Sequence, residues 1–329
     1  MKLAFIGASH WHLPLYLDPA LQIEGVQVVG VSDPDAACVK ALAARLGCAG
    51  DTDFRALCRK TRPDFVVALG RHCDMVEEAR FLLEEGIPFA LEKPCGLNAR
   101  DAIELAALEE RTGNFAAVPL VFRNGDFTLL LRKIAAQGTQ YMSFRFIAGF
   151  PARYQQANCH WMLDPALSGG GSTINLGIHF FDLALLLMGA DARVRHATMS
   201  NAAFGHPVED YGLVVLEQGA DLCVIETGYL YPAPTSTFDM HYAVRTPHDY
   251  LVAHDPETVE LVHSSGERQM IASHTTNVAH YRTFMRDVLD RVRAGRPPLA
   301  RLSDMVPIMR LVGDAYAKAG PLRKSTVSA

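Results

Sequence analysis

The sequence has no excess of positive charge. It contains 31 Lys and Arg against 36 Asp and Glu, which gives a formal net charge of −5, and it has no run of basic residues. Proteins that bind nucleic acids cluster Lys and Arg on one surface to neutralise backbone phosphates. The composition offers no such surface, so we expect no nucleic-acid partner.

Paired cysteine motifs and long apolar runs are missing as well. The seven cysteines form no CxxC pair, which argues against a disulfide framework and favours reduced thiols in a cytoplasm. The opening "MKLAFIG" is too short for a signal peptide, and no later stretch has the roughly 18 apolar residues of a membrane span. We therefore expect a cytoplasmic protein without a membrane partner.

A metal motif, internal repeats and low-complexity tracts are also absent. His10 and His12 lie close together, but no third ligand follows at a suitable spacing, so we expect no bound metal. At 329 residues the chain is long enough for two domains, each with its own core.

The first 120 residues alternate short apolar runs with helix-like segments. The predicted strands are 2–7, 26–33, 64–70 and 87–94, and the predicted helices begin near Trp11 or span 35–47, 74–86 and 98–113. Continuous apolar strands that alternate with helices are typical of a parallel, doubly wound α/β sheet.

The second half has a different pattern. Apolar runs at 193–200, 211–218, 221–231, 237–246 and 258–263 are separated by short polar turns, and several alternate apolar with polar residues. This alternation predicts a largely antiparallel sheet with one covered face, followed by closing helices at 281–293 and 305–319. We place the domain boundary at 118–123, which divides residues 1–120 from an α+β domain at 121–329.

The turn after the first strand, "GASHWH" (7–12), resembles an imperfect dinucleotide fingerprint. Gly7 occupies the first glycine position, whereas Ser9 and His12 stand at the second and third. Ser9 can cap the next helix, whose free N–H groups attract phosphate. Asp33 ends the second strand 26 residues beyond Gly7, where a carboxylate binds ribose hydroxyls and repels a 2′-phosphate. The pattern predicts NAD in preference to NADP.

Three motifs together resemble the Gfo/Idh/MocA family of sugar and polyol oxidoreductases. They are Glu92-Lys93-Pro94 within 62–105, the block "SGGGSTINLGIHFFDLALLLMG" at 168–189, and the closing segment 298–320. The resemblance implies an N-terminal Rossmann domain and a C-terminal open-sheet domain. It also implies NAD-dependent hydride transfer at a hydroxyl-bearing carbon of a sugar, cyclitol or sugar derivative.

The resemblance also implies roles for individual residues. Lys93 matches the lysine beside the nicotinamide and within reach of the substrate hydroxyl, and His179 matches the histidine that acts as acid or base. An imidazole with its ordinary pKa of about 6.5 suits proton transfer near neutral pH, and an ammonium group stabilises developing negative charge. Asp182 matches an aspartate one turn beyond, more structural than catalytic. Asn175 stands where many members carry an aspartate, and an amide cannot take a proton.

The predicted sites follow from these positions. The predicted cofactor residues are Gly7, Ala8, Ser9, His10, Trp11, His12, Asp33, Leu69, Gly70, Arg71, His72, Glu92, Lys93 and Pro94. The predicted substrate residues are Lys93, Arg123, His160, Trp161, Asn175 and His179, of which Lys93, Asn175 and His179 are the predicted catalytic group.

Several of these residues have a second interpretation. Arg123 is equally consistent with a charge at the domain junction, while His160 and Trp161 are candidates to roof the pocket. Tyr229 and Tyr231 are more typical of sheet packing than of ligand binding. We expect the glycine run at 169–171 to let substrate and nicotinamide approach closely.

Two other functions stay open at this point. One is a non-catalytic sensor that binds NAD and a sugar, which Asn175 and the imperfect turn favour. The other is a relative that cleaves glycosides or eliminates through transient oxidation, without net redox change. Intact Lys93 and His179 favour the oxidoreductase. The resemblance also implies a homodimer or homotetramer formed through the exposed sheet face.

Overall fold

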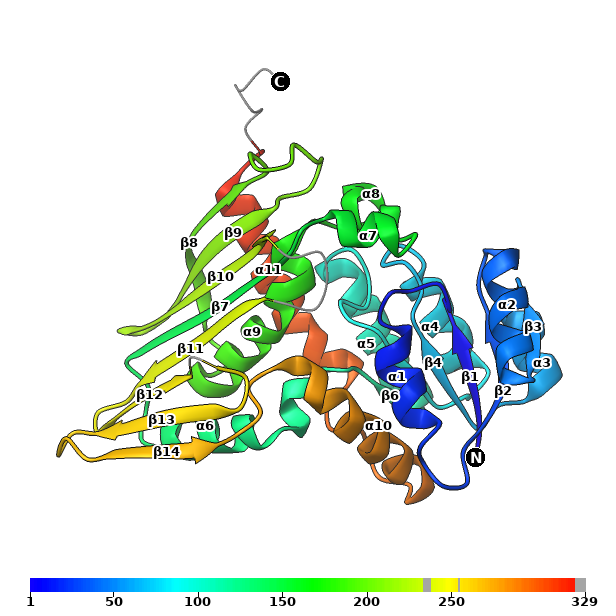
Figure 1. Ribbon diagram of the computed structural model, residues 1–329, viewed down its shortest axis with the longest axis horizontal. Helices are drawn as coiled ribbons and strands as arrows, with labels where there is room; N and C mark the ends of the chain where they lie inside the picture. Colours follow the sequence, from blue (N-terminus) through cyan, green and yellow to red (C-terminus); the bar gives the residue numbers. More distant parts are fainter. Residues whose placement is uncertain (233–237, 254, 323–329) are drawn as a thin grey trace.

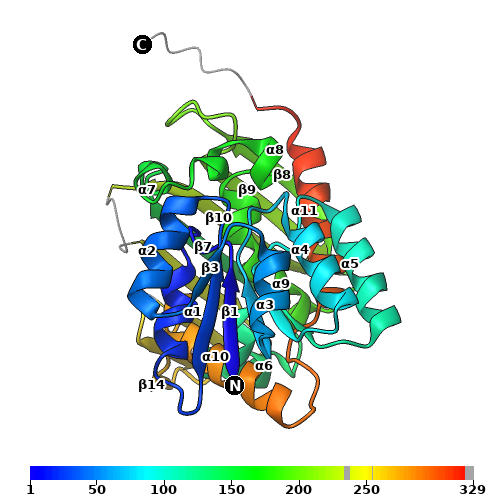
Figure 2. The same ribbon diagram turned by 90° about the vertical axis from the view of Figure 1, so that its right-hand side faces the viewer.

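The computed structural model describes residues 1–232, 238–253 and 255–322, and these form two β-sheets that lie side by side with helices around them (Figures 1 and 2). The first half of the chain builds one sheet and the second half builds the other, so the predicted fold class is confirmed.

The first sheet is six-stranded and parallel, with the order β3-β2-β1-β4-β5-β6. Its strands are β1 (Lys2–Ile6), β2 (Gln27–Ser32), β3 (Ala49–Asp51), β4 (Phe65–Ala68), β5 (Phe89–Leu91) and β6 (Ala116–Ala117). The connecting helices are α1 (Leu13–Ala20), α2 (Ala36–Leu46), α3 (Phe54–Thr61), α4 (Met75–Glu84) and α5 (Ala99–Thr112). In such a sheet a ligand binds where the strand order reverses, here beyond the carboxyl ends of β1 and β4.

Local signals explain why these elements begin and end where they do. The β4 strand is apolar at every position because helices cover both faces of the sheet. Helix α2 starts where the Asp35 carboxylate accepts from the amides of Ala37 and Cys38, at 2.8 and 3.3 Å. It ends at Gly47, whose φ of +63° is the left-handed conformation of a C-cap. The predicted strands and helices of this half are confirmed to within a few residues.

The second sheet is eight-stranded, with the order β14-β13-β12-β11-β7-β10-β9-β8. Its strands are β7 (Tyr141–Gly149), β8 (Arg193–Ser200), β9 (Tyr211–Gln218), β10 (Asp221–Tyr231), β11 (Asp239–Arg245), β12 (Asp249–Ala253), β13 (Thr258–His263) and β14 (Arg268–Ala272). All neighbours are antiparallel except β7 and β10, which are parallel. Thr237, the first residue of the run predicted at 237–246, lies outside the described residues.

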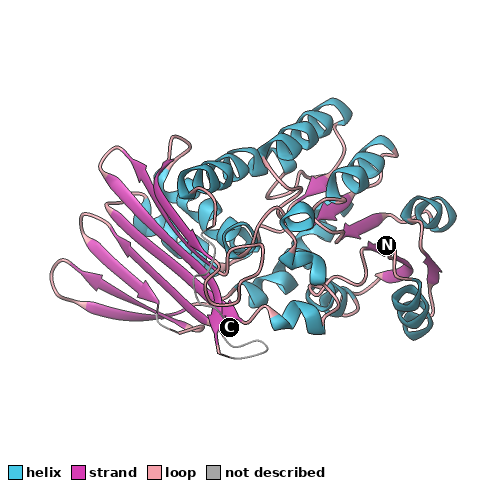
Figure 3. Cartoon of the chain, turned by 90° about the horizontal axis from the view of Figure 1, so that it is seen from above, coloured by secondary structure: helices cyan, strands magenta, loops and turns pink. Residues whose placement is uncertain are grey.

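Helices lie along one face of this sheet (Figures 1 and 3). They include α6 (Asp126–Ala135), α9 (Ser172–Met188) and α11 (Met305–Ala319), and the shorter segments near them are α7 (Ala152–Gln156), α8 (Pro165–Ser168), η1 (Val121–Asn124), η2 (His160–Leu163) and η3 (Leu302–Asp304). The expectation of one covered face is met. Oligomer formation through the other face stays a prediction.

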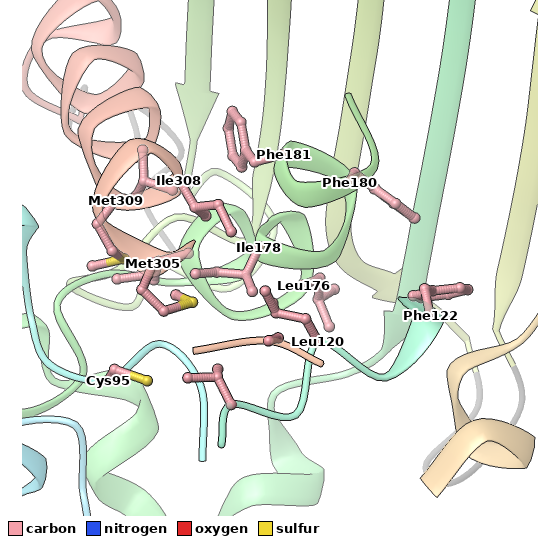
Figure 4. Close-up of a cluster of buried hydrophobic side chains, with 14 of the residues drawn as sticks. Cys95, Leu120, Phe122, Leu176, Ile178, Phe180, Phe181, Met305, Ile308 and Met309 are labelled. Carbon is pink, nitrogen blue, oxygen red and sulfur yellow. The ribbon is translucent and has the colours of Figure 1, made fainter. Parts of the chain in front are cut away.

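Helix α9 is the centre of the second half. All of its residues from Ser172 to Ala184 are buried, because it packs on β10 and β9 and also against α6 and α11. Figure 4 shows Ile178 of α9 in the same apolar cluster as Met305 of α11 and Cys95, which is buried as expected of a small core residue.

The stretch Pro165–Met188 corrects one expectation. It is long and apolar enough by composition to cross a membrane, although we expected no such segment. The apolar 18-residue window within this stretch is 83% buried inside the protein, as in the core helix of a soluble fold.

Helix α10 (Asn277–Arg293) crosses between the two halves of the chain (Figure 1). Its residues Tyr281, Phe284 and Leu289 belong to the apolar core on one face of the first sheet. The Tyr281 ring meets the Tyr16 ring of α1 edge-on, with centroids 5.1 Å apart. A segment from the second half therefore completes the core of the first, and the division at residue 120 stays a prediction about chain order alone.

Candidate active site

The turn after β1 is built around Gly7, whose backbone has a φ of +69°. A Cβ atom here would lie 2.5 Å from the carbonyl carbon of Leu69 and 2.6 Å from the nitrogen of Gly70, in the loop after β4. Only glycine fits where two backbone segments approach so closely. The first glycine of the fingerprint is thus required by packing between the β1 and β4 loops.

The rest of the turn differs from the prediction. Helix α1 begins at Leu13, and its N-cap is His12 rather than Ser9. The Ser9 amide instead donates to Asp33 Oδ2 at 2.7 Å, and the His12 amide donates to His10 Nδ1 at 3.0 Å. The predicted N-cap role of Ser9 is wrong, because its bond to the end of β2 holds it in the turn before the helix begins.

Asp33 lies just beyond β2 with both carboxylate oxygens held by backbone amides. Oδ2 accepts from Ser9, and Oδ1 accepts from the Asp35 amide at 2.9 Å. Asp33 is only 3% exposed, yet it lines a cavity of about 240 Å³ that we call the cofactor cavity. Each carboxylate oxygen has a further lone pair, so Asp33 can still accept from a ribose hydroxyl.

The cofactor cavity lies at the carboxyl ends of β1, β2 and β4. Seven predicted cofactor residues line it, namely Gly7, Ser9, His10, Asp33, Leu69, Gly70 and Arg71. A ribose acceptor at Asp33 and a position at the reversal of strand order fit an adenine dinucleotide. The predicted residues Ala8, His72, Glu92 and Pro94 line neither this cavity nor the one described next.

One acid in the cofactor cavity is not among the predicted residues. Glu78 of α4 is buried, and its Oε2 accepts from the Gly70 amide at 3.2 Å. Burial raises the pKa of Glu78 to about 8. No motif marks this residue, since it lies on a helix face whose burial depends on the loop after β4.

Three histidines beside this cavity are buried and uncharged. Burial lowers the pKa of His10, His12 and His72, the last to about 3. His72 Nδ1 lies 2.6 Å from the Ser168 carbonyl oxygen, which can only accept, so this nitrogen carries the proton. Across the described ranges, no three His, Cys, Asp or Glu side chains gather as a metal site requires.

A second cavity, of about 470 Å³, lies between α1, α7 and α9, and we call it the substrate cavity. Lys93, Asn175 and His179 all line it, together with Trp11 and His12. The predicted catalytic residues therefore share one cavity, although Lys93 follows β5 of the first sheet and the other two belong to α9.

Lys93 is held by Asn175 at the wall of the substrate cavity. Its Nζ donates to the Asn175 side-chain Oδ1 at 2.8 Å and to the Asn175 backbone oxygen at 2.7 Å. An ammonium has three protons, so one remains for a ligand. Burial lowers the pKa of Lys93 to about 8, although the charge of Glu92 opposes this shift.

Glu92 acts on Lys93 from behind the cavity wall. Its Oε1 accepts from the Lys93 amide at 3.1 Å, and its Oε2 accepts from the Tyr16 hydroxyl and lies 3.3 Å from His12 Nδ1. Burial alone would raise the pKa of Glu92, but the contact with His12 Nδ1 and the charge of Lys93 hold it below its ordinary value. The carboxylate thus supplies a fixed negative charge that partly stabilises the Lys93 ammonium.

His179 is buried at the substrate cavity, and neither ring nitrogen has a hydrogen-bond partner among the described residues. Burial and the charge of Lys93 lower its pKa to about 3, so the imidazole is neutral at ordinary pH. The Phe122 ring holds it edge-on, with centroids 5.5 Å apart. Unpaired buried nitrogens are costly, which suits a group that a ligand is meant to meet.

Two tyrosines fix the amide of Asn175. Its Nδ2 donates to the Tyr154 hydroxyl at 2.7 Å and to the Tyr229 hydroxyl at 3.0 Å. With Oδ1 accepting from Lys93, the amide has one possible orientation. Tyr229 is buried in the sheet, as its expected packing role requires, but it also reaches the site, and Tyr154 is absent from the predicted residues. Neither belongs to a motif, and their approach depends on how β10 and α7 meet α9.

Arg123 faces a carboxylate rather than the substrate cavity. Its Nε and Nη2 donate to the two oxygens of Asp182, the closest at 2.6 Å, and its Nη1 lies 3.1 Å from Asp304. His160 is exposed and lines neither cavity, whereas Trp161 lines the cofactor cavity. A substrate role for Arg123 and His160 remains a prediction that this geometry does not favour.

The glycines before α9 are required for a reason other than the one expected. A Cβ at Gly170 would overlap the Tyr316 hydroxyl, and one at Gly171 would overlap the Glu209 backbone oxygen. Neither glycine lines the cofactor cavity or the substrate cavity. These two glycines admit neighbouring parts of the protein, and the expectation that the run admits substrate and nicotinamide stays a prediction that this geometry does not favour.

Two family models match the chain. The NAD-binding Rossmann-fold model of the GFO/IDH/MocA oxidoreductase family matches residues 1–119, and the GFO/IDH/MocA C-terminal domain model matches residues 137–246. The chain belongs to the GFO/IDH/MocA family. Its first half is the NAD-binding Rossmann fold of this family of oxidoreductases.

Individual relatives agree with this assignment. A putative UDP-kanosamine synthase oxidoreductase subunit of Amycolatopsis mediterranei is 29% identical over 191 residues, which are 58% of this chain and about half (51%) of that protein. An inositol dehydrogenase homolog from Azotobacter vinelandii, solved with NAD+, has a TM-score of 0.84 at 16% identity, covering 97% and 95% of the two chains. GenD2 from gentamicin A biosynthesis, solved with NAD, has a TM-score of 0.82 at 21% identity, covering 100% and 97%. The two structures share the fold of this GFO/IDH/MocA protein.

The cofactor cavity predicts a preference for NADH over NADPH. The Asp33 carboxylate lies where it would bind the ribose hydroxyls of the cofactor. Repulsion of a 2′-phosphate by about 1.4 kcal/mol or more would weaken the binding of NADPH at least tenfold relative to NADH. A fluorescence titration with each nucleotide measures this ratio. Asp33→Asn keeps an oxygen acceptor and removes the charge, so it should narrow the preference. Equal or tighter NADPH binding by the unaltered protein would contradict the role of Asp33.

Proposed function

We propose that this protein transfers a hydride between NAD and a hydroxyl-bearing carbon of a sugar, cyclitol or sugar derivative. The observation that carries the proposal is the meeting of Lys93, Asn175 and His179 on one cavity, with free hydrogen-bonding capacity on Lys93 and His179. One relative is named for UDP-kanosamine and one structural neighbour for inositol. Both names support a polyhydroxylated substrate.

Oxidation of a hydroxyl-bearing carbon requires the loss of a hydroxyl proton along with the hydride. The nicotinamide, when bound, supplies the hydride acceptor or donor. Gly7 and Asp33 would hold the dinucleotide in the cofactor cavity. The residues of the substrate cavity must then bind the hydroxyl and move its proton.

Lys93 is the group best suited to move that proton. Acid–base catalysis is most efficient when the pKa of the group lies near the working pH, and burial brings that of Lys93 to about 8. Two hydrogen bonds to Asn175 fix the position of its Nζ. In the ammonium form, Lys93 also stabilises negative charge on the substrate oxygen.

His179 then has a positioning role. With a pKa of about 3 it is a poor base in the free protein, but its neutral ring offers one N–H donor and one lone pair to substrate hydroxyls. The role of acid and base that the family resemblance gives to His179 is therefore reassigned to Lys93 in this proposal.

The two assignments differ in their pH dependence. For the oxidation direction, kcat/KM should rise with pH through an inflection near 8, as the free protein loses the Lys93 proton. Asn175→Asp would place a carboxylate beside the Lys93 ammonium, so the inflection should move upward while activity is retained. An inflection near the ordinary histidine pKa of about 6.5 that does not respond to Asn175→Asp would return the base role to His179.

A turnover screen tests the function as a whole. Purified protein with NAD is offered a panel of monosaccharides, cyclitols and sugar phosphates, and NADH formation is followed by absorbance. At least one compound should reduce the cofactor. Release of an altered sugar without NADH would instead indicate cleavage or elimination, and sugar binding without any product would indicate a sensor.

A further inference from the structure

The charged side chains that line the substrate cavity are both positive, although Glu92 lies behind Lys93 and partly offsets its charge. The lining includes Lys93 and Arg153 but neither Asp nor Glu among the described residues. The two histidines of the lining, His12 and His179, are neutral because burial lowers the pKa of each. A neutral sugar requires no such excess of positive charge.

Arg153 of α7 has no charged partner among the described residues. Its Nη2 donates to the Tyr154 hydroxyl at 2.7 Å, and its Nε is buried without a hydrogen-bond partner. No Asp or Glu of the described residues lies within 4.0 Å, and the ranges 233–237, 254 and 323–329 contain no Asp or Glu in their sequence. By contrast, Arg123 in the same half of the chain is neutralised by Asp182 and Asp304.

Aromatic rings hold the Arg153 guanidinium in place. Its central carbon lies 4.7 Å from the ring centroid of Tyr154, 5.3 Å from that of Trp11 and 5.4 Å from that of Tyr229. Such cation–π contacts orient a guanidinium without neutralising it. A partly buried cation that is oriented but unpaired is available to an incoming anion.

We propose that Arg153 binds an anionic group of the substrate, so that the preferred substrate is a sugar or cyclitol carrying a phosphate or a carboxylate. The inference rests on the proposed function in one respect, the assignment of this cavity to the substrate. The planar guanidinium matches two oxygens of a carboxylate or phosphate at once. Arg153 is thus a specificity residue, while Lys93 serves the reacting hydroxyl.

The size of the cavity favours a charged monosaccharide. The volume of about 470 Å³ must admit the nicotinamide end of the cofactor as well as the substrate. Ligand sites for small molecules span roughly 300–1,000 Å³, a range that accommodates a monosaccharide with one anionic group. A phosphate or carboxylate on the sugar itself supplies the anion within that space.

Binding measurements test the proposal without requiring turnover. Protein saturated with NADH is titrated by calorimetry with glucose, glucuronate, glucose 6-phosphate, UDP-glucose and inorganic phosphate. We expect at least one anion to bind ten times more tightly than glucose. Arg153→Met should weaken that anion about 10- to 100-fold, because hydrogen bonds to charged groups contribute about 1.5–3 kcal/mol. Arg153→Lys should give an intermediate loss, since it keeps the charge without the planar fork.

Arg132→Met is the matched control. Arg132 is exposed on α6 and lines neither cavity, so its removal changes the net charge equally but should leave anion affinity unchanged. A preference confined to UDP-glucose and lost in Arg153→Met would support the anion site and identify a nucleotide diphosphate as its source. No anion binding tighter than glucose, or the same anion affinity in Arg153→Met, would overturn the proposal. Failure of the turnover screen alone would contradict the proposed function and leave this result standing.

Discussion

Replacing Lys93 by methionine should lower kcat about 10³-fold, which is within the range for loss of an acid–base group and of charge stabilisation in a dry site. Its Nζ donates to the backbone and side-chain oxygens of Asn175, and its third proton is free for a ligand. Methionine has a similar length and no charge. Steady-state kinetics with the best substrate of the turnover screen measures the loss.

A measurement of NADH affinity distinguishes a catalytic defect of Lys93→Met from a folding defect. Lys93 does not line the cofactor cavity, so Lys93→Met should bind NADH almost as tightly as the unaltered protein. Lys133→Met, on the exposed face of α6, is the control for loss of one lysine. If Lys93→Met turned over at the normal rate, the catalytic assignment would be wrong. If it lost NADH binding as well, the defect would lie in the fold of the site.

The second large effect concerns stability. Arg123→Met should lower the free energy of unfolding by about 3–5 kcal/mol, the cost of leaving one member of a buried ion pair without its partner. The Asp182 side chain is 2% exposed and is bound by Arg123 Nε and Nη2, at 3.0 and 2.6 Å for the two carboxylate oxygens. Urea denaturation of both proteins measures the difference.

Two further variants test whether the loss of stability comes from the unpaired charge of Asp182. Asp304→Asn removes the more exposed partner of Arg123, at 32% side-chain exposure, and should cost less than about 1 kcal/mol. Adding Asp182→Leu to Arg123→Met removes the unpaired buried charge and should recover part of the lost stability. Unchanged stability of Arg123→Met together with a raised KM would instead place Arg123 at the substrate.

Local patterns predict most of the first half because its elements carry their own boundaries. Helix α2 has its cap at Asp35 and its end at Gly47, and β4 is apolar throughout. The prediction of Ser9 as an N-cap fails for a non-local reason. Its amide is taken by Asp33, which is distant in sequence and adjacent only after β1 and β2 pair.

In the second half, too, local sequence patterns miss features that depend on contacts distant in sequence. Strand β7 and helix α7 are absent from the predicted elements, although β7 lies between β10 and β11 in the sheet. With them, Arg153 and Tyr154 are absent from the predicted site. Their positions depend on long-range strand pairing, which no short motif encodes.

By itself, the sequence determined the two-sheet fold class and the family, and it predicted that Lys93, Asn175 and His179 act together, because these inferences depend on periodicity and on short motifs. Only the tertiary structure decided the chemistry that these residues can perform. Burial brings the pKa of Lys93 to about 8 and that of His179 to about 3, and α7 adds the unpaired cation of Arg153. Desolvation and charge pairing depend on every atom around a group, and those atoms come from parts of the chain that meet only in the folded protein.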